Sequence, residues 1–407
     1  MADIPAPEPT NSSQKSTAWE VFWTFLKLGL TSFGGPIAHL GYFRTETVQR
    51  RGWLKDEEYA DLVALCQFLP GPASSQVGFA LGMHRAGFLG ALAAFVAFTL
   101  PSAALLILFA LGISLFDSPS TQGLLTGLKV VAVAIVAQAV LGMAKNLTPD
   151  KTRATIAVIA AGCALLLPGS AGQVIAIIFG LVAGYFFCRS STTATGGNLH
   201  LPVPRIVGIV SLELFATLLL GLPLLLAATG SSVVVLVDSF YRAGALVFGG
   251  GHVVLPLLHN GVVETGWIAE QDFLAGYGIA QAVPGPLFTF AAFLGTITTV
   301  GPNGILGATI ALLAIFLPGF LLLIGVLPFW NSLRQRAWAQ AAMRGANAAV
   351  VGVLGAALYI PVFTSAITGP ATFTLALACF VLLTTWKLPP WTVVLVGALG
   401  GVLLTLI

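Results

Sequence analysis

Apolar stretches long enough to cross a bilayer recur along most of the 407 residues and are separated by short charged or Gly/Pro-rich segments. About twenty helical residues span the hydrocarbon core, so each such stretch predicts a transmembrane helix. The pattern therefore predicts an all-α polytopic membrane protein. Thirteen windows meet the criterion, at residues 19–36, 59–82, 87–113, 122–143, 153–168, 171–188, 208–229, 232–251, 271–297, 303–329, 338–360, 366–386 and 390–407.

The second half of the chain repeats the first in its Gly, Pro, Trp and cationic positions. The order is kept at spacings of 214 to 217 residues, which chance repetition of apolar text would not produce. The repeat pairs Lys27 with Arg242, Gly34–Gly35 with Gly249–Gly250, Gly52–Trp53 with Gly266–Trp267, Gln67 with Gln281, Pro70–Gly71–Pro72 with Pro284–Gly285–Pro286, Pro101 with Pro318, and Lys129 with Arg344.

The window 208–229 has no counterpart in this repeat. Six crossings return a chain to its starting face, and one further crossing inverts every later segment, so we expect an inverted repeat of the kind that many transporters use. The predicted organisation is a polar N-terminal tail (1–18), a first repeat (19–188), a linker (189–207), a connecting transmembrane helix (208–229) and a second repeat (232–407).

Composition supports the membrane assignment and excludes other classes. Hydrophobic residues make up 57% of the chain and charged residues 8%, against roughly 25% charged in a soluble domain. The net charge is +3 and no cationic run exceeds Arg50–Arg51, so a nucleic-acid surface is not expected. Cys66, Cys163, Cys188 and Cys379 lie in apolar stretches without CxxC spacing, which favours buried thiols over a disulfide framework.

The distribution of cations suggests the orientation. If all thirteen windows cross, ten cations outside the segments share one face, while Arg44, Arg50, Arg51 and Lys55 lie on the other. If the first two segments of each half instead enter and leave on the same side, all fourteen share one face, and the loop with Glu264, Glu270 and Asp272 faces the opposite side. We prefer this re-entrant version with a cytoplasmic N-terminus; kinked but complete crossings remain the alternative.

The turn chemistry agrees with interrupted segments. Pro removes amide donors and Gly permits a reversal, so Gly34–Gly35–Pro36 and Pro70–Gly71–Pro72 predict breaks, as do Gly249–Gly250 and Pro284–Gly285–Pro286. Helices that restart after such breaks present free amides and a positive dipole end, which bind oxyanions. Neutral donors lie nearby. They are Ser74, Ser75, Gln76 and Thr289 after the Pro-Gly-Pro motifs, and Gln67 and Gln281 before them.

Four repeat-paired cations lie inside apolar segments: Lys27 with Arg242, and Lys129 with Arg344. A buried cation in a membrane costs about 2.5–3.5 kcal/mol and usually has a function or a partner. Asp238 and Glu213 are too few to neutralise all four, which favours an anion site bounded by Lys27 and Arg242; snorkelling of the lysines to the interface is the alternative. His39 and His252 follow the Gly-Gly breaks and are expected to be interfacial rather than proton-coupling.

The motifs LKLGLTSFGGPIAHLGYF, GWLKDEEYADLVALCQFLPGP and FTLPS, with FGGG, AQAVPGP and FLPG in the second half, resemble the chromate ion transporter family in its long two-domain form. The resemblance covers nearly the whole chain. It implies a bacterial inner-membrane carrier that exports chromate, with sulfate as competitor, and it implicates the glycines and prolines of the four breaks. The second half departs from the motif at Gly251, where the first half has Pro36.

Two rival functions remain open: an anion channel of the same architecture, and a polytopic enzyme or lipid-handling protein. No HExxH, Walker or Ser/His/Asp set occurs, so an enzyme is the weaker class, and neither a cofactor nor a metal is expected. The expected partners are a chromate-like or sulfate-like oxyanion and the lipid bilayer. The oligomeric state is open, with a homodimer among the options.

Overall fold

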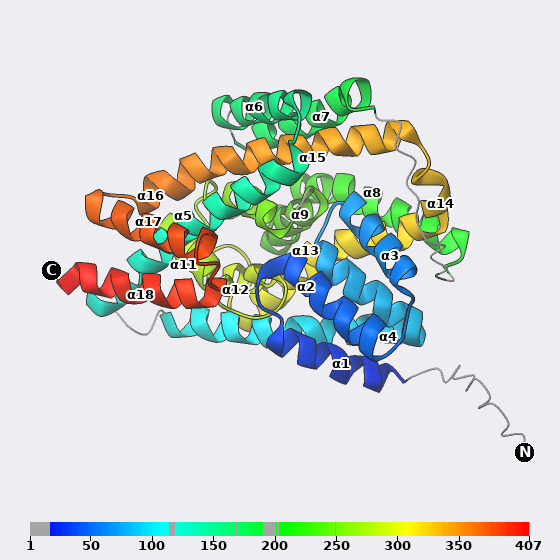
Figure 1. The fold of residues 1–407 in the computed structure, drawn as a ribbon, viewed down its shortest axis with the longest axis horizontal. Helices are drawn as coiled ribbons and strands as arrows, with labels where there is room; N and C mark the ends of the chain where they lie inside the picture. Colours follow the sequence, from blue (N-terminus) through cyan, green and yellow to red (C-terminus); the bar gives the residue numbers. More distant parts are fainter. Residues whose placement is uncertain are drawn as a thin grey trace, which may run out of the picture.

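The computed structural model of the chain describes residues 17–113, 119–167, 169–189, 201, 203–248 and 250–406. Within these ranges all regular secondary structure is helical (Figure 1). The α-helices are α1 Ala18–Thr31, α2 Gly35–Phe43, α3 Asp56–Phe68, α4 Ala73–Ile113, α5 Pro119–Leu147, α6 Lys151–Leu166, α7 Gly169–Phe187, α8 Arg205–Thr229, α9 Ser232–Ala245, α10 Val254–Val262, α11 Glu270–Ala280, α12 Phe290–Ile297, α13 Gly304–Val326, α14 Trp330–Leu333, α15 Ala337–Ala357, α16 Thr364–Ala366, α17 Pro370–Thr384 and α18 Pro390–Leu406.

Short π-helical or 3₁₀ turns join some of these helices. They are η1 Arg44–Arg50, η2 Gly251–Val253, η3 Leu287–Thr289, η4 Leu327–Phe329 and η5 Leu358–Phe363. Almost all of the predicted N-terminal tail and most of the predicted linker lie outside the described residues.

Both halves follow the same order of elements, with α8 between them. Helix α4 reverses at Ala86 and Gly87, where the backbone leaves helical geometry, and Gly82 then packs against Gly90. In the second half α12 and α13 form the equivalent hairpin, with Gly295 against Gly307. Glycines at these positions allow two helix backbones to approach more closely than any side chain would permit.

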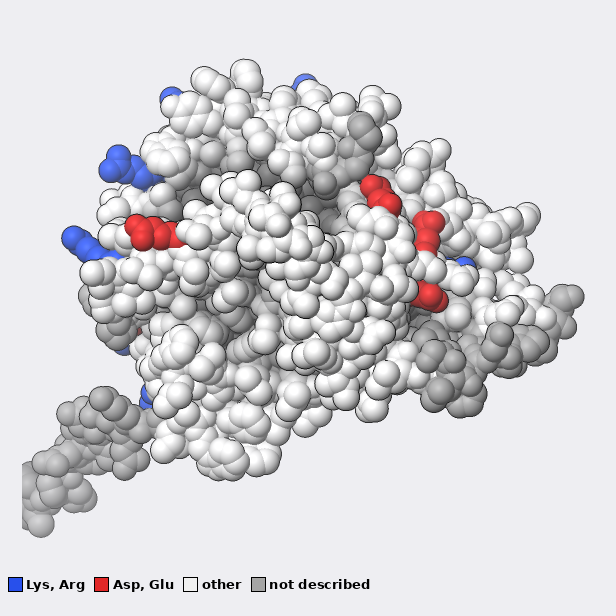
Figure 2. Space-filling model, turned by 180° about the vertical axis from the view of Figure 1, so that it is seen from behind, with Lys and Arg blue, Asp and Glu red and all other residues white. Residues whose placement is uncertain are grey.

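Five helical stretches among the described residues are long and apolar enough to cross a membrane: Ala73–Gly112, Gln122–Leu147, Arg205–Thr229, Gly304–Leu333 and Ala337–Ala366. Four shorter apolar helices accompany them. Figure 2 shows a broad uncharged surface on one face, with most visible cations toward one end and most visible acids toward the other. These features make the chain a multi-pass membrane protein; the inversion of the repeat and the count of thirteen segments stay predictions.

The two halves are interlocked rather than side by side. The hairpin α6–α7 of the first half packs on α15 of the second, and the hairpin α17–α18 of the second half packs on α5 of the first (Figure 1). Small residues make both contacts, because a side chain on Gly345 would overlap Gly180 and Gly184, and one on Gly401 would overlap Gly123. Each half therefore depends on the other for the burial of its hairpin.

Candidate functional site

The helices are interrupted at the Gly-Gly motifs of both halves. Helix α1 ends at Thr31 and α2 begins at Gly35, with Gly34 and Gly35 at φ of 97° and 77°. Helix α9 ends at Ala245, and Gly250, at φ of 138°, precedes the 3₁₀ turn η2 that leads into α10. L side chains rarely adopt these positive φ values, which explains glycine at the breaks. Gly249 lies outside the described residues.

The Pro-Gly-Pro motifs interrupt the next pair of helices. Helix α3 ends at Phe68 and α4 begins directly after Pro72, while α11 ends at Ala280 and the 3₁₀ turn η3 follows Pro286 before α12. Gly71 and Gly285 both have positive φ, 119° and 107°. The first half thus restarts at once as α-helix after each break, whereas the second half inserts a 3₁₀ turn at each.

The breaks of one half meet the breaks of the other through two reciprocal hydrogen bonds. The Gly71 amide donates to the Val247 carbonyl at 2.7 Å, and the Gly285 amide donates to the Ser32 carbonyl at 3.0 Å. Ser32 and Val247 occupy equivalent places in the repeat, as do Gly71 and Gly285. Each Pro-Gly-Pro turn is therefore held by the unwound end of the opposite half's first helix, and we call these four joined breaks the crossing.

Packing at the crossing is also reciprocal, because each Pro-Gly-Pro glycine packs against the opposite half. A β-carbon on Gly71 would lie 3.0 Å from Gly319 Cα, and one on Gly285 would lie 2.8 Å from Ser102 Oγ; Ser102 and Gly319 are themselves equivalent. Gly251 packs on its own counterpart, since a β-carbon there would lie 3.2 Å from Pro36 Cγ. The departure at Gly251 has a steric rationale, because a side chain there would crowd the Pro36 ring.

Polar side chains around the crossing belong mainly to the first half. Gln76, fully buried, donates from Nε2 to the carbonyls of Pro70 (3.1 Å) and Gly319 (2.8 Å), and so ties the first Pro-Gly-Pro turn to the second half. His39 Nδ1 lies 3.4 Å from Ser74 Oγ. In the second half the position equivalent to Gln76 is Phe290, so the neutral lining of the crossing is asymmetric.

Several buried polar atoms at the crossing make no hydrogen bond within the described part of the chain. Buried polar groups are normally paired, so such atoms have free capacity to bind a polar ligand or water. They are Ser32 Oγ, His39 Nε2, Ser75 Oγ, Gln76 Oε1, Thr99 Oγ1 and Gln281 Nε2. Two of the donors predicted from the sequence are not unpartnered buried groups. Gln67 is exposed, and the Thr289 hydroxyl donates to the Pro286 carbonyl at 2.7 Å.

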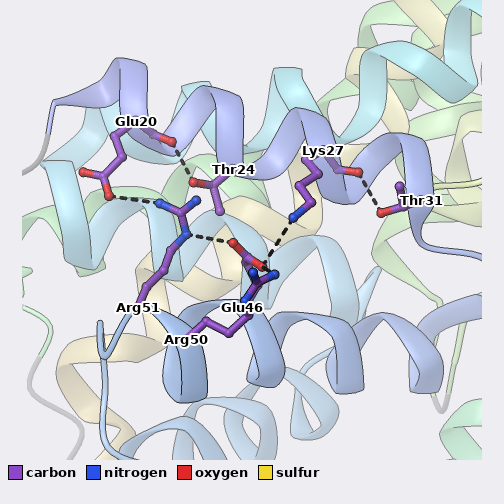
Figure 3. Close-up of polar contacts among 7 residues, drawn as sticks. All are labelled: Glu20, Thr24, Lys27, Thr31, Glu46, Arg50 and Arg51. Atoms are coloured by element: carbon purple, nitrogen blue, oxygen red, sulfur yellow. Dashed lines mark hydrogen bonds and ion pairs between the residues drawn. The ribbon is translucent and has the colours of Figure 1, made fainter.

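The predicted cations have partners of their own. Lys27 is 59% exposed and lies 3.9 Å from the nearly buried Glu46, which also binds Arg50 and Arg51 (Figure 3). Burial alone would raise the pKa of Glu46, but the Arg51 hydrogen bond and the three neighbouring cations together lower it. The structure therefore places Lys27 in an ion-pair network between α1 and η1.

The other three cations are also engaged. Arg242 Nε donates to Asp238 at 2.8 Å within α9, and Lys129 lies close enough to Asp272 for its charge to act there. Arg344 Nε donates to the Cys188 carbonyl at 3.0 Å, with a buried Nη2 that makes no hydrogen bond in the described ranges. None of these contacts joins a cation to the crossing.

The breaks were evident from the sequence, but several residues that the structure brings to them were not. Ser32, Thr99, Ser102 and Gly319 line or support the crossing. The last three lie in FTLPS and FLPG, motifs whose repetition was visible in the sequence. That repetition could have identified them, because motifs kept in both copies usually serve a shared structural contact.

The comparisons with known proteins agree with this architecture. The family model described as chromate transporter matches residues 19–185 and 234–402, one match in each half. The chain is 29% identical to a probable chromate transport protein of Synechococcus elongatus, covering 93% of both chains, and 28% identical to a chromate transport protein of Cupriavidus metallidurans, covering 97% of this chain and 95% of that one. An uncharacterised transporter of Methanocaldococcus jannaschii is 29% identical over 78% of each chain.

No solved structure matches the chain. The family match covers both repeats and most of the sequence, and the related proteins named above are transport proteins rather than enzymes. The chain belongs to the chromate transporter family.

Proposed function

We propose that this protein carries a tetrahedral oxyanion, chromate in the first place, across the membrane through the crossing. The observation that supports this most directly is the reciprocal pair of hydrogen bonds from Gly71 to Val247 and from Gly285 to Ser32. They bring two restarting helices and several unpartnered buried polar atoms to one place. Helix N-termini and neutral donors are the groups that proteins use for oxyanions.

We further propose that the two halves have opposite orientations, with the broken segments re-entrant. Helix α8, the extra segment between the halves, supports this arrangement. It is lined with exposed apolar side chains, and only 6% of its most apolar window is buried. The close approach of Pro36 and its counterpart Gly251 also supports this arrangement, because equivalent residues meet at a two-fold axis between repeats. Broken backbone at membrane depth is tolerated where protein or water surrounds it.

Export is the direction that electrostatics favours. A dianion that leaves a cell with a negative interior gains about 4.6 kcal/mol per 100 mV, twice the value of roughly 2.3 kcal/mol for one charge. Sulfate has the same charge and shape, so donor geometry discriminates poorly between the two ions and sulfate is the expected competitor. The N-terminus is proposed to be cytoplasmic, in a bacterial inner membrane.

The test is the uptake of labelled chromate and sulfate into inverted vesicles, with and without an interior-positive potential. We expect uptake above that of vesicles without the protein, accelerated by the potential. Ser75→Ala removes an unpartnered buried hydroxyl and should weaken substrate affinity about ten- to hundredfold, as expected for a hydrogen bond to a charged group worth about 1.5–3 kcal/mol.

Thr289→Val is the matched control, because Thr289 is equivalent to Ser75 but its hydroxyl already donates to Pro286. Its affinity should change less. Uptake no greater than in empty vesicles would refute the function, and an unchanged affinity in Ser75→Ala would refute the site. Counterflow separates a carrier from a channel, since anion on the far side accelerates exchange only in a carrier.

A further inference from the structure

A cleft of about 730 Å³ opens beside the Gly-Gly break of the first half. Its walls come from both halves: the break itself at Phe33 and Gly34, helix α5, and the turn between α17 and α18. Figure 1 shows this turn beside the start of α2, near the middle of the molecule rather than at its end. The rings of Phe33 and Trp391, 6.4 Å apart, join the two sides.

The lining of the cleft is cationic. Lys145 on α5 and Lys387 in the turn between α17 and α18 both line it, and no acidic residue does. Neither lysine forms an ion pair with any described residue. This distinguishes them from Lys27 and Arg242, each of which has a carboxylate partner. A concave surface with one sign of charge and apolar walls concentrates ions of the opposite sign.

The backbone at Lys387 adds an independent observation. Its φ is 55°, and it is the one non-glycine residue with positive φ among those the structure describes. The turn is closed by the Leu388 amide, which donates to the Leu382 carbonyl at 3.0 Å. A left-handed conformation favours glycine by about 1–2 kcal/mol over an L side chain. The chain therefore keeps a lysine at a position where the backbone alone would select glycine.

We propose that this cleft is a second oxyanion site, in which Lys145 and Lys387 hold a tetrahedral dianion next to Gly34. Two ammonium groups balance two negative charges. The Gln138 amide nitrogen and the Thr384 hydroxyl both donate to backbone carbonyls, of Leu383 and Phe380 respectively, and the two lysines are the cationic donors that line the cleft. If the bound oxyanion then moves from the cleft to the crossing, that step rests on the proposed transport function. Binding of an oxyanion in the cleft does not depend on it.

Binding is tested without transport, by thermal unfolding of the purified protein in neutral detergent with increasing sulfate, and with chloride at matched ionic strength as control. We expect saturable stabilisation by sulfate. Lys387→Gly removes the charge and relieves the backbone, so this variant should be at least as stable as the wild type without ligand, yet weaken sulfate binding tenfold or more. Lys145→Gln should weaken it similarly, and Lys387→Arg should retain it.

The phosphate of an anionic lipid has the same chemistry, so a parallel arm uses nanodiscs of phosphatidylcholine with and without phosphatidylglycerol. Lysine-dependent stabilisation by sulfate supports the site with a free ion as ligand, and lysine-dependent stabilisation by phosphatidylglycerol alone supports it with a lipid headgroup. Stabilisation that is absent, or equal in the wild type, Lys387→Gly and Lys145→Gln, overturns the proposal. Lysine-dependent binding without flux in vesicles would support the oxyanion site in the cleft and refute only the proposed transport function.

Discussion

Replacement of Gly71 by alanine tests whether the two halves meet at the crossing as described. Gly71 has φ of 119°, outside the regions that alanine adopts readily, and this alone costs about 1–3 kcal/mol. Its new β-carbon would lie 3.0 Å from Gly319 Cα, a backbone atom of the other half that cannot rotate away. Overpacking of this kind costs about another 1–3 kcal/mol. We expect Gly71→Ala to be destabilised by about 2–6 kcal/mol in total.

Two further variants separate the cost of the positive φ from the cost of overpacking. Gly285→Ala has a similar φ of 107°, but its β-carbon would meet the Ser102 hydroxyl, which can rotate at the loss of its hydrogen bond to the Thr99 carbonyl. Gly230→Ala, in the turn between α8 and α9, has φ of 59° and open space around it, so it reports only the conformational cost of about 1–2 kcal/mol. The expected order of destabilisation is Gly71, then Gly285, then Gly230.

The assay is equilibrium unfolding in detergent micelles, followed by tryptophan fluorescence, together with labelled sulfate flux in vesicles. Gly230→Ala should keep normal flux, and Gly71→Ala should lose it because the hydrogen bond from the Gly71 amide to the Val247 carbonyl is disturbed. Equal stability of Gly71→Ala and Gly230→Ala would show that Gly71 does not pack on the second half, and the account of the crossing would then be wrong.

The remaining predictions concern charge and topology. Glu46→Gln should lower the free energy of unfolding by about 1.5–3 kcal/mol, as expected for hydrogen bonds to charged groups. The folded pKa of Glu46 is lowered, so its contribution to stability is present above the unfolded pKa near 4.3 and is lost as the pH falls through the folded pKa. The melting curves of Glu46→Gln and the wild type should therefore converge as the pH falls below the folded pKa. Arg242 pairs with Asp238 in the structure, but the sequence predicts that it borders the anion site. On that hypothesis Arg242→Gln should abolish anion flux while the protein stays folded, and full flux would refute a role for Arg242. Single cysteines at Glu57 and Glu264, in a background with the native cysteines replaced by serine, should react with impermeant reagent from opposite sides, and labelling of position 57 from outside would contradict the re-entrant topology.

Local backbone chemistry made the breaks predictable. Gly34, Gly71 and Gly285 occupy motifs whose residues act on their own segment, because Pro removes a donor at its own position and Gly tolerates positive φ there. The structure has helix ends at all of these motifs. The positions of the restarting helices could therefore be inferred from the sequence, whereas the 3₁₀ turns of the second half could not.

The residues that the charged side chains contact could not be predicted from local sequence in the same way. The sequence suggests Asp238 and Glu213 as partners for the four cations, but Lys27 lies against Glu46, which is outside the predicted apolar windows. Similarly, the sequence shows Lys387 only as a cation between two apolar segments, and its place in a cleft beside Gly34 depends on how α17 and α18 pack on α5. These contacts join residues that are distant in sequence, and neither periodicity nor spacing specifies them.

The sequence by itself determined the membrane class, the duplication, the positions of the breaks and the family, because each depends on composition or on motifs read along one segment. Only the tertiary structure decided that each break is closed by the opposite half, that the hairpins are exchanged, and that Gly251 must be small where Pro36 is not. The physical reason is that backbone conformation is a local property, whereas hydrogen-bond partners and close helix contacts arise when distant segments compete for the same buried space.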